Sequence, residues 1–261
     1  MTDSRTPADN EPRGAASGPR GAERGARRAE SGARRADRRL IIAIDGPSGA
    51  GKGTISRAVA AKLSYEHIDT GAMYRAVAWK ALHEGVELDD EDAVVEVAGR
   101  AEFELGAGVV RVDGHDVAEA IRTPEIDRAA AAVARQSRVR EVLIARQRAM
   151  GEHGAIVMEG RDIGTVVFPQ ADVKIFLDAT AEERARRRAN DPAHASGRNG
   201  TAIHDVKSAL EERDHSDRTR AASPLTQAAD AVVVDTTGLS IEAAVERVLA
   251  AVEEARSKGI K

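Results

Sequence analysis

A glycine-rich loop constrains what this chain can fold into more than any other stretch. The loop comprises Gly46-Pro47-Ser48-Gly49-Ala50-Gly51-Lys52-Gly53-Thr54. The β-branched run 40–44 before it predicts a buried strand, and apolar residues at helical spacing follow from Ile55 to Leu63. Glycines let successive backbone N–H groups turn toward phosphate oxygens, while Lys52 and the N-terminus of the helix add positive charge. The loop is therefore predicted to bind phosphate groups.

The composition excludes several classes of protein. The chain has 261 residues, 42% hydrophobic and 31% charged, enough for one large core or two small domains. Only 2% of the residues are aromatic, which argues against a nucleic-acid platform built on base stacking. The absence of cysteine excludes disulfides, thiolate catalysis and cysteine-ligated zinc. No apolar run approaches the length of a membrane helix and no signal-peptide pattern begins the chain, so we expect no membrane partner and a cytoplasmic location.

Residues 1–39 have the composition of a disordered tail. They contain no Val, Ile, Leu, Phe, Tyr or Trp and cannot bury a core. Ten Arg against six acidic residues give this segment a net charge of +4, which leaves −8 on the remaining 222 residues. We expect a solvated tail rich in Arg, Gly and Ala, with weak contact to polyanions as the alternative. Six acidic residues are too many for a mitochondrial transit peptide.

Strands and helices alternate along most of the chain. Further buried strands are predicted at 67–69, 155–158, 173–177 and 231–235, with helices between them. This alternation predicts an α/β fold, a doubly wound five-stranded parallel sheet with helices on both faces. Three segments, 40–85, 121–182 and 221–261, would make up this core. Residues 86–120 instead combine short strands with Gly-containing turns, which predicts a small antiparallel insert.

An arginine-rich helical segment, 183–220, follows the fourth predicted strand. Its first helix carries Arg184, Arg186, Arg187 and Arg188, its second carries Arg213, and a loop at 192–201 joins the two. Such a weakly packed hairpin is typical of a lid whose cations meet phosphate charge when it closes and excludes water. The alternative is a solvated pair of charged helices.

Two sites at strand ends are further candidates for binding an anion. Arg75 lies just beyond the strand 67–69, where ligands bind in open α/β sheets. Gly160-Arg161-Asp162 follows the strand 155–158, with Arg161 suited to a phosphate and Asp162 able to accept from an amino group. The alternatives are a solvated Arg75 and a structural turn with an internal Arg161–Asp162 pair. Phosphoryl transfer needs positioning, charge neutralisation and exclusion of water, and these cations beside a phosphate loop favour it.

Two other classes of nucleotide-binding protein fit less well. A GTPase switch needs an Asn-Lys-x-Asp motif, which the sequence lacks. An ATP-driven nucleic-acid-binding protein could use the arginine-rich tail, and salt-dependent affinity for DNA or RNA would reveal it.

Several motifs together resemble bacterial cytidylate kinases, a family of nucleoside monophosphate kinases with a phosphate loop. They are Ile44 to Thr54, Asp69-Thr70-Gly71-Ala72-Met73-Tyr74-Arg75, Ile121-Arg122-Thr123, Gly160-Arg161-Asp162-Ile163-Gly164-Thr165-Val166-Val167-Phe168-Pro169, Glu212-Arg213-Asp214 and Asp217-Arg218-Thr219-Arg220. The likeness runs from about Leu40 to Ala255 in collinear order. It implies ATP-dependent phosphorylation of CMP and dCMP, with UMP or AMP as alternative acceptors.

The resemblance also implies roles for individual residues. Gly46 to Thr54 would hold the ATP phosphates, and the cations assisting the transfer would be Lys52, Arg161, Arg213 and Arg220. The CMP phosphate would be bound by Thr70, Arg75 and Arg161. The cytosine would be contacted by Arg140 and Asp162, and the residues closing over the acceptor would be Arg213, Asp217 and Arg220. Mg²⁺ would accompany ATP, and a monomer would suffice.

Two positions depart from the expected patterns. The family usually has a serine that contacts the base where this chain has Ala131, and losing one such hydrogen bond would cost about 1 kcal/mol of discrimination between CMP and UMP. Gly53 stands where phosphate loops usually place a Ser or Thr that binds Mg²⁺, and the hydroxyl comes at Thr54. The family shares this glycine, which implies that Mg²⁺ is held mostly by phosphates and water, with no direct protein ligand.

Overall fold

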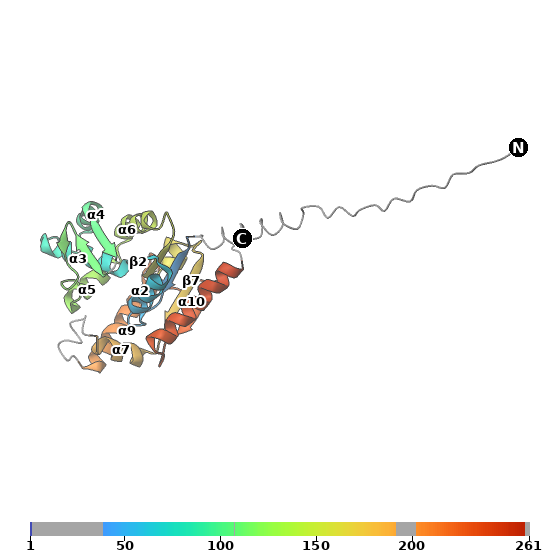
Figure 1. Ribbon diagram of the computed structural model, residues 1–261. Coiled ribbons are helices and arrows are strands. Elements are labelled where there is room, and N and C mark those ends of the chain that lie inside the picture. The colour runs from blue at the N-terminus through green and yellow to red at the C-terminus, as the bar shows by residue number, and fades with distance from the viewer. Residues whose placement is uncertain (2–38, 107, 192–201, 259–261) are drawn as a thin grey trace. The chain divides into compact units, whose positions relative to one another are not determined.

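The computed structural model describes Met1 and residues 39–106, 108–191 and 202–258. The predicted tail, except for its two end residues, and the predicted loop 192–201 lie outside these described residues. Residues from Arg39 onward form one compact unit, shown in Figure 1.

A five-stranded sheet lies at the centre of this unit. Its strands are β1 (Ile41–Asp45), β2 (Glu66–Asp69), β6 (Ile156–Gly160), β7 (Val173–Asp178) and β8 (Val232–Asp235). They follow the order β2-β6-β1-β7-β8, and every neighbouring pair is parallel. The predicted parallel sheet is therefore confirmed, and the strand of the glycine-rich loop, β1, lies in its middle.

Helices cover both faces of the sheet. Successive residues of β1 point to opposite faces, so each face carries apolar side chains that a helix can bury. Ile42 and Ile44 pack with apolar residues of α2 (Lys52–Leu63) and α10 (Ile241–Ser257). Ala43 faces the other side, toward α6 (Ser137–Met150) and a short π-helix, η1 (Ile163–Val167). The sequence predicted only a glycine-flanked turn at the start of η1.

A second cluster of elements packs beside the sheet around α3 (Thr70–His83), as Figure 1 shows. It contains α4 (Glu91–Arg100), α5 (Pro124–Val133) and the antiparallel strands β3 (Phe103–Gly106), β4 (Val109–Val112) and β5 (His115–Asp116). Met73 and Val77 of α3 contact Ala129 and Val133 of α5 within one buried apolar cluster. The predicted antiparallel strands are thus present, while the division of the chain into domains stays a prediction.

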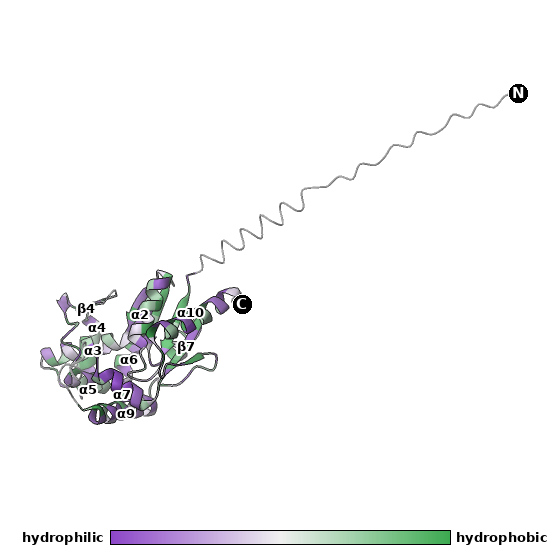
Figure 2. Cartoon of the chain, turned by 60° about the horizontal axis from the view of Figure 1, so that its bottom comes forward, coloured by the Kyte–Doolittle hydropathy of each residue, from purple (hydrophilic) through white to green (hydrophobic). Residues whose placement is uncertain are grey.

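The arginine-rich segment forms two packed helices, α7 (Ala181–Ala189) and α9 (Ile203–Thr219). Their shared apolar contact is small and consists of Ala185, Val206 and Leu210, with Ala189 at its edge. Figure 2 colours both helices mostly purple, for hydrophilic residues, whereas β7 is green. The two predicted helices are confirmed, and their function as a lid stays a prediction.

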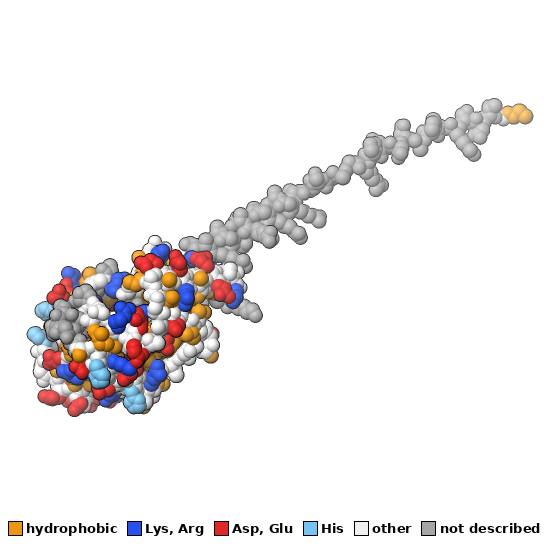
Figure 3. All heavy atoms as spheres, turned by 90° about the horizontal axis from the view of Figure 1, so that it is seen from below, with side chains coloured by type: hydrophobic (Ala, Val, Ile, Leu, Met, Phe, Trp, Pro, Cys, Tyr) orange, Lys and Arg blue, Asp and Glu red, His pale blue; other side chains and the backbone are white. Residues whose placement is uncertain are grey.

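Figure 3 shows the charged side chains on one face of the described residues. On the face drawn in Figure 3, acidic side chains are interspersed among Lys and Arg, so no patch of one sign dominates that view. Among the described residues, no helix combines the length and the apolar character needed to cross a lipid bilayer.

Candidate active site

The glycine-rich loop connects β1 to α2 in a backbone conformation that depends on its glycines. Gly46 has a φ of 148°, and a Cβ at this position would lie 2.0 Å from the carbonyl oxygen of Leu177 on β7. Gly51 has a φ of 91° and caps α2, which begins at Lys52. Because the first N–H groups of a helix lack intrahelical partners, the loop presents backbone donors at the carboxyl end of the central strand.

Lys52 is held within this loop, since its Nζ donates to the carbonyl oxygen of Pro47 at 2.7 Å. Burial lowers the pKa of the Lys52 ammonium to about 7, and the positive charge of Arg161 contributes to this shift. Glu159, Asp45 and Asp214 oppose it. An arriving anion would restore the charge of the ammonium, so Lys52 suits a phosphate ligand.

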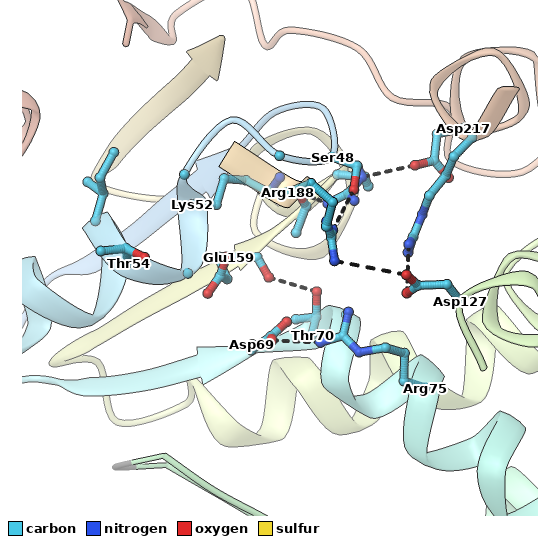
Figure 4. A pocket seen from close by; sticks show the side chains of 18 of the residues that line it. Ser48, Lys52, Thr54, Asp69, Thr70, Arg75, Asp127, Glu159, Arg188 and Asp217 are labelled. Carbon is cyan, nitrogen blue, oxygen red and sulfur yellow. Dashed lines mark hydrogen bonds and ion pairs between the residues drawn. The ribbon is translucent and has the colours of Figure 1, made fainter. Parts of the chain in front are cut away.

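A pocket of about 450 Å³ opens above the loop, and Figure 4 shows the side chains that line it. The residues predicted to bind ligands that line this pocket are Ser48, Gly49, Gly51, Lys52, Gly53, Thr54, Thr70, Arg75, Arg140, Arg161, Asp162, Arg213, Asp217 and Arg220. Gly46, Pro47 and Ala50 of the predicted loop are buried and shape it from beneath. The structure therefore brings the predicted phosphate-binding and acceptor-binding residues into one space.

The end of β6 supplies two charged residues that bond to separate partners. The guanidinium of Arg161 donates through Nε to Asp217 of α9 at 2.9 Å. Although burial raises the pKa of Asp217, the positive charge of Arg161 and of two further arginines holds it below its ordinary value. Arg161 and Asp162 thus contact different residues, so the alternative of a purely internal pair receives no support.

Asp162 lies between two arginines in the deepest part of the pocket. Its carboxylate pairs with the Nη2 atom of Arg140, and its other oxygen lies 3.7 Å from Nη2 of Arg220. Arg140 and Asp162 are only 2% and 5% exposed, so water reaches neither charge freely. The Nε atom of Arg140 and the Nη2 atom of Arg220 are buried without a hydrogen-bond partner, which leaves donors for a ligand.

Thr70 and Arg75 lie where β2 meets α3. Thr70 Oγ1 donates to the carbonyl oxygen of Glu159 at 2.7 Å. Asp69 caps α3 by accepting from the N–H of Ala72, and its other carboxylate oxygen accepts from Arg75 at 2.9 Å. Arg75 is therefore paired and directed into the pocket, as Figure 4 shows, and the alternative of a free solvated side chain is wrong.

The base of the α7–α9 pair is attached to the phosphate loop, a contact that sequence reasoning missed. Arg184 of α7 pairs with Asp214 of α9, and both are at most 7% exposed. Arg184 Nη1 donates to the carbonyl oxygen of Ser48 at 2.9 Å, and Asp214 accepts from the N–H of Ser48 at 3.2 Å. The pair is thus packed more closely at its base than its polar sequence predicted.

Two further pocket residues, Glu159 and Asp127, were not predicted, and Arg188 was predicted only as one of the lid cations. Glu159 lies on β6 beside the phosphate loop, and a Cβ at Gly53 would come within 3.4 Å of its Oε1 atom. His67 Nε2 lies 2.9 Å from the same oxygen. Arg188 and Asp127 meet across the pocket. A single acid at the end of a strand, as Glu159, or in the first turn of a helix, as Asp127, gives no signal in the sequence that would single it out.

These features define a P-loop phosphotransferase, with a phosphate loop on the central strand and arginines converging from the end of a neighbouring strand and from four helices. The family model for cytidylate kinase matches residues 42–254. The cytidylate kinase of Solibacter usitatus is 47% identical over 222 residues, which cover 85% of this chain and 96% of that protein. The cytidylate kinase of Desulforamulus reducens is 48% identical over 218 residues, which cover 82% and 97%. The chain belongs to the cytidylate kinase family.

Proposed function

We propose that this protein transfers the γ-phosphoryl group of ATP to CMP and dCMP. The observation that carries the proposal is the buried cluster of Arg140, Asp162 and Arg220 in the same pocket as Lys52. A carboxylate flanked by guanidinium donors can accept a hydrogen bond from the amino group of cytosine. The guanidinium groups then face the carbonyl oxygen and the ring nitrogen of the same base. Uracil carries a carbonyl in place of that amino group and would meet Asp162 unfavourably.

The phosphate loop supports ATP as the donor. Its backbone donors and Lys52 suit a triphosphate, and the pocket extends past the loop to Leu239, Ile241 and Ala244. These apolar side chains offer a surface on which a purine ring can rest. The CMP phosphate would lie on the opposite side of the loop, near Thr70, Arg75 and Arg161.

The transfer needs no side chain as a general base, because a phosphate oxygen of CMP is already a nucleophile. That oxygen forms a bond to the γ-phosphorus while the bond from phosphorus to the β–γ bridging oxygen breaks and ADP leaves. Lys52, Arg161, Arg213 and Arg220 would stabilise the charge that spreads over the transferred group. Closure of the α7–α9 pair would exclude water, which would otherwise compete with CMP for the phosphoryl group.

Mg²⁺ would bind with ATP and neutralise its phosphate charge. Two oxygen-bearing side chains of the pocket are candidates to face the metal ion: Thr54 carries a hydroxyl within the phosphate loop, and Glu159 abuts Gly53. Mg²⁺ retains water ligands readily, so phosphates and water would supply most of its coordination. Among the residues that the structure describes, no three His, Asp or Glu side chains form a cage for a metal ion.

The proposed enzyme acts as a monomer in the cytoplasm. All residues named in the mechanism come from one chain and line one pocket, so no second copy is needed to complete it. The chain has no cysteine, so it forms no disulfide that would require an oxidising compartment.

The proposal is tested by measuring ADP release from ATP and Mg²⁺ with CMP, dCMP, UMP, AMP, GMP and dTMP. We expect CMP and dCMP to dominate. A preference for UMP or AMP would mean that Arg140 and Asp162 do not contact cytosine as proposed. If none of the six acceptors stimulated ADP release, the phosphotransferase proposal itself would fail.

A further inference from the structure

Asp127 lies at the mouth of the pocket, opposite the phosphate loop. It belongs to the first turn of α5, and the Thr123 side chain caps this helix. A carboxylate in the first turn favours a helix because it faces the positive end of the helix dipole. The simplest explanation of Asp127 is therefore that it stabilises α5.

The contacts of Asp127 go beyond its own helix. Its Oδ1 atom lies 3.0 Å from Nη1 of Arg213 on α9, and its Oδ2 atom lies 3.9 Å from Nη1 of Arg188 on α7. The same Arg188 donates through Nη2 to the Ser48 hydroxyl of the phosphate loop at 3.2 Å. Figure 4 shows Ser48, Arg188 and Asp127 meeting in the pocket. One carboxylate therefore links both helices of the α7–α9 pair to α5.

Two arginines share the single carboxylate of Asp127. Burial lowers the pKa of the Arg188 guanidinium, and Asp127 opposes that effect. The positive charges of Arg213 and Arg75 lower the pKa of Arg188 further, whereas the negative charge of Asp191 raises it. Asp127 offers two arginines one shared negative charge, whereas a polyphosphate can offer each of them charged oxygens of its own.

We propose that Asp127 is a positioning residue. Its carboxylate takes the place of a phosphate beside Arg188 and Arg213 until the nucleotide phosphates displace it. The proposal rests on the proposed function, because it assumes that phosphates enter this pocket. When the phosphates bind, the arginines exchange the single carboxylate for a ligand of higher charge. Asp127 thereby lowers the affinity of the resting enzyme for phosphate and keeps its arginines oriented.

The test separates the charge of Asp127 from its shape. Asp127→Asn keeps the size and one accepting oxygen but removes the negative charge, and Asp127→Glu keeps the charge. The matched control is Asp92→Asn, because Asp92 also pairs with an arginine, Arg138, but is exposed and outside the pocket. Binding of inorganic tripolyphosphate to the full chain is measured by calorimetry at low salt, which requires no acceptor and no turnover.

We expect Asp127→Asn to bind tripolyphosphate about three- to tenfold more tightly than the wild-type protein, whereas Asp127→Glu and Asp92→Asn stay within about twofold. If CMP is an acceptor, the KM for ATP should fall by a similar factor in Asp127→Asn. If Asp127 only stabilised α5, its replacement would lower Tm without tightening the binding of tripolyphosphate.

Equal or weaker tripolyphosphate binding in Asp127→Asn would overturn the proposal, as would a wild-type protein that binds no tripolyphosphate. Because tripolyphosphate binding needs no acceptor, failure of CMP phosphorylation alone would leave this comparison intact.

Discussion

Asp45 Oδ2 accepts a hydrogen bond from the backbone N–H of Gly164 at 2.7 Å. The other oxygen of Asp45 accepts from the N–H of Ile163 at 2.8 Å. Asp45 ends the strand that leads into the phosphate loop, and Ile163 directly follows Asp162. One buried carboxylate thus fixes the distance between the phosphate loop and the turn that carries the proposed base contact.

Asp45→Asn should weaken both the fold and the acceptor site. The asparagine presents an N–H₂ group to one of the two backbone N–H groups, so one buried donor loses its partner, at a cost of about 1–3 kcal/mol in the free energy of unfolding. The KM for CMP should rise because Asp162 loses its fixed position. Urea denaturation at pH 7 and steady-state kinetics would measure both, with Asp230→Asn as an exposed control. A variant as stable as the control would refute this function of Asp45.

The wild-type protein should show an unusual dependence of stability on pH that Asp45→Asn lacks. Burial raises the pKa of Asp45 to about 6 in the folded protein from 3.8, against the effect of its two backbone hydrogen bonds. The carboxyl of Asp45 therefore binds its proton more tightly in the folded than in the unfolded protein. Above pH 6 the buried negative charge lowers the free energy of unfolding, and this loss disappears as the pH falls toward 4. The difference in free energy of unfolding between the wild-type protein and Asp45→Asn should therefore grow as the pH falls from 6 to 4. Denaturation curves that differ by a constant amount over this range would contradict the assignment.

Arg161→Ala should reduce turnover far more than it changes ATP binding. Arg161 lies beside Asp217 and Lys52 at the proposed point of transfer, where charge develops. Removing one such donor typically lowers kcat by about 10² to 10³, while the KM for ATP should stay within about threefold. Arg186→Ala is the control, since Arg186 is exposed and pairs with Glu183 outside the pocket. Equal losses in kcat and in ATP affinity would show that Arg161 only binds the donor.

Binding of ATP should be accompanied by proton uptake by Lys52. The free protein holds this ammonium at a pKa of about 7, so the side chain is largely neutral at pH 8. Phosphates favour the charged form and raise its pKa, so about one proton enters per ATP bound at pH 8 and almost none at pH 6. The affinity for ATP should fall as the pH rises above 7. Calorimetry with Mg²⁺ and ATP in buffers of different ionisation enthalpy gives the number of protons. Uptake that persisted unchanged in Lys52→Arg would assign the proton to another group.

Ala131→Ser should sharpen the choice of acceptor. Ala131 lines the pocket next to the proposed cytosine site, and a hydroxyl there could form one further hydrogen bond to the base. A bond worth about 1 kcal/mol would raise the ratio of kcat/KM for CMP over UMP about fivefold. Ala132→Ser, on the adjacent position of α5 and outside the lining of this pocket, is the control. An unchanged ratio would indicate that residue 131 does not contact the base.

The sequence predicted the elements of the fold better than their assembly. The loop from Gly46 to Thr54 and the five strands were recognisable because local hydrophobic periodicity and glycine spacing determine them. The order of the strands was not predicted, since it depends on which segments pair across the sheet. Resemblance to a family, and not spacing, indicated that Arg140 belongs with Asp162.

The contacts that complete the site join residues far apart along the chain. Asp45 and Ile163 are separated by 118 positions, and Ser48 and Asp214 by 166. No sequence motif includes Asp127, and only the folded structure brings Arg213 to it. No local pattern predicts such pairs, because their partners are selected by tertiary packing.

The convergence of arginines on one pocket also bears on the direction of the proposed reaction. A triphosphate and a monophosphate carry about the same total charge as the two diphosphates that replace them. Arginines that surround both phosphate sites, such as Arg75 and Arg213, therefore stabilise reactants and products to a similar extent. We therefore expect the reaction to run in either direction, with the ratio of ATP to ADP around the protein determining which nucleotide accumulates.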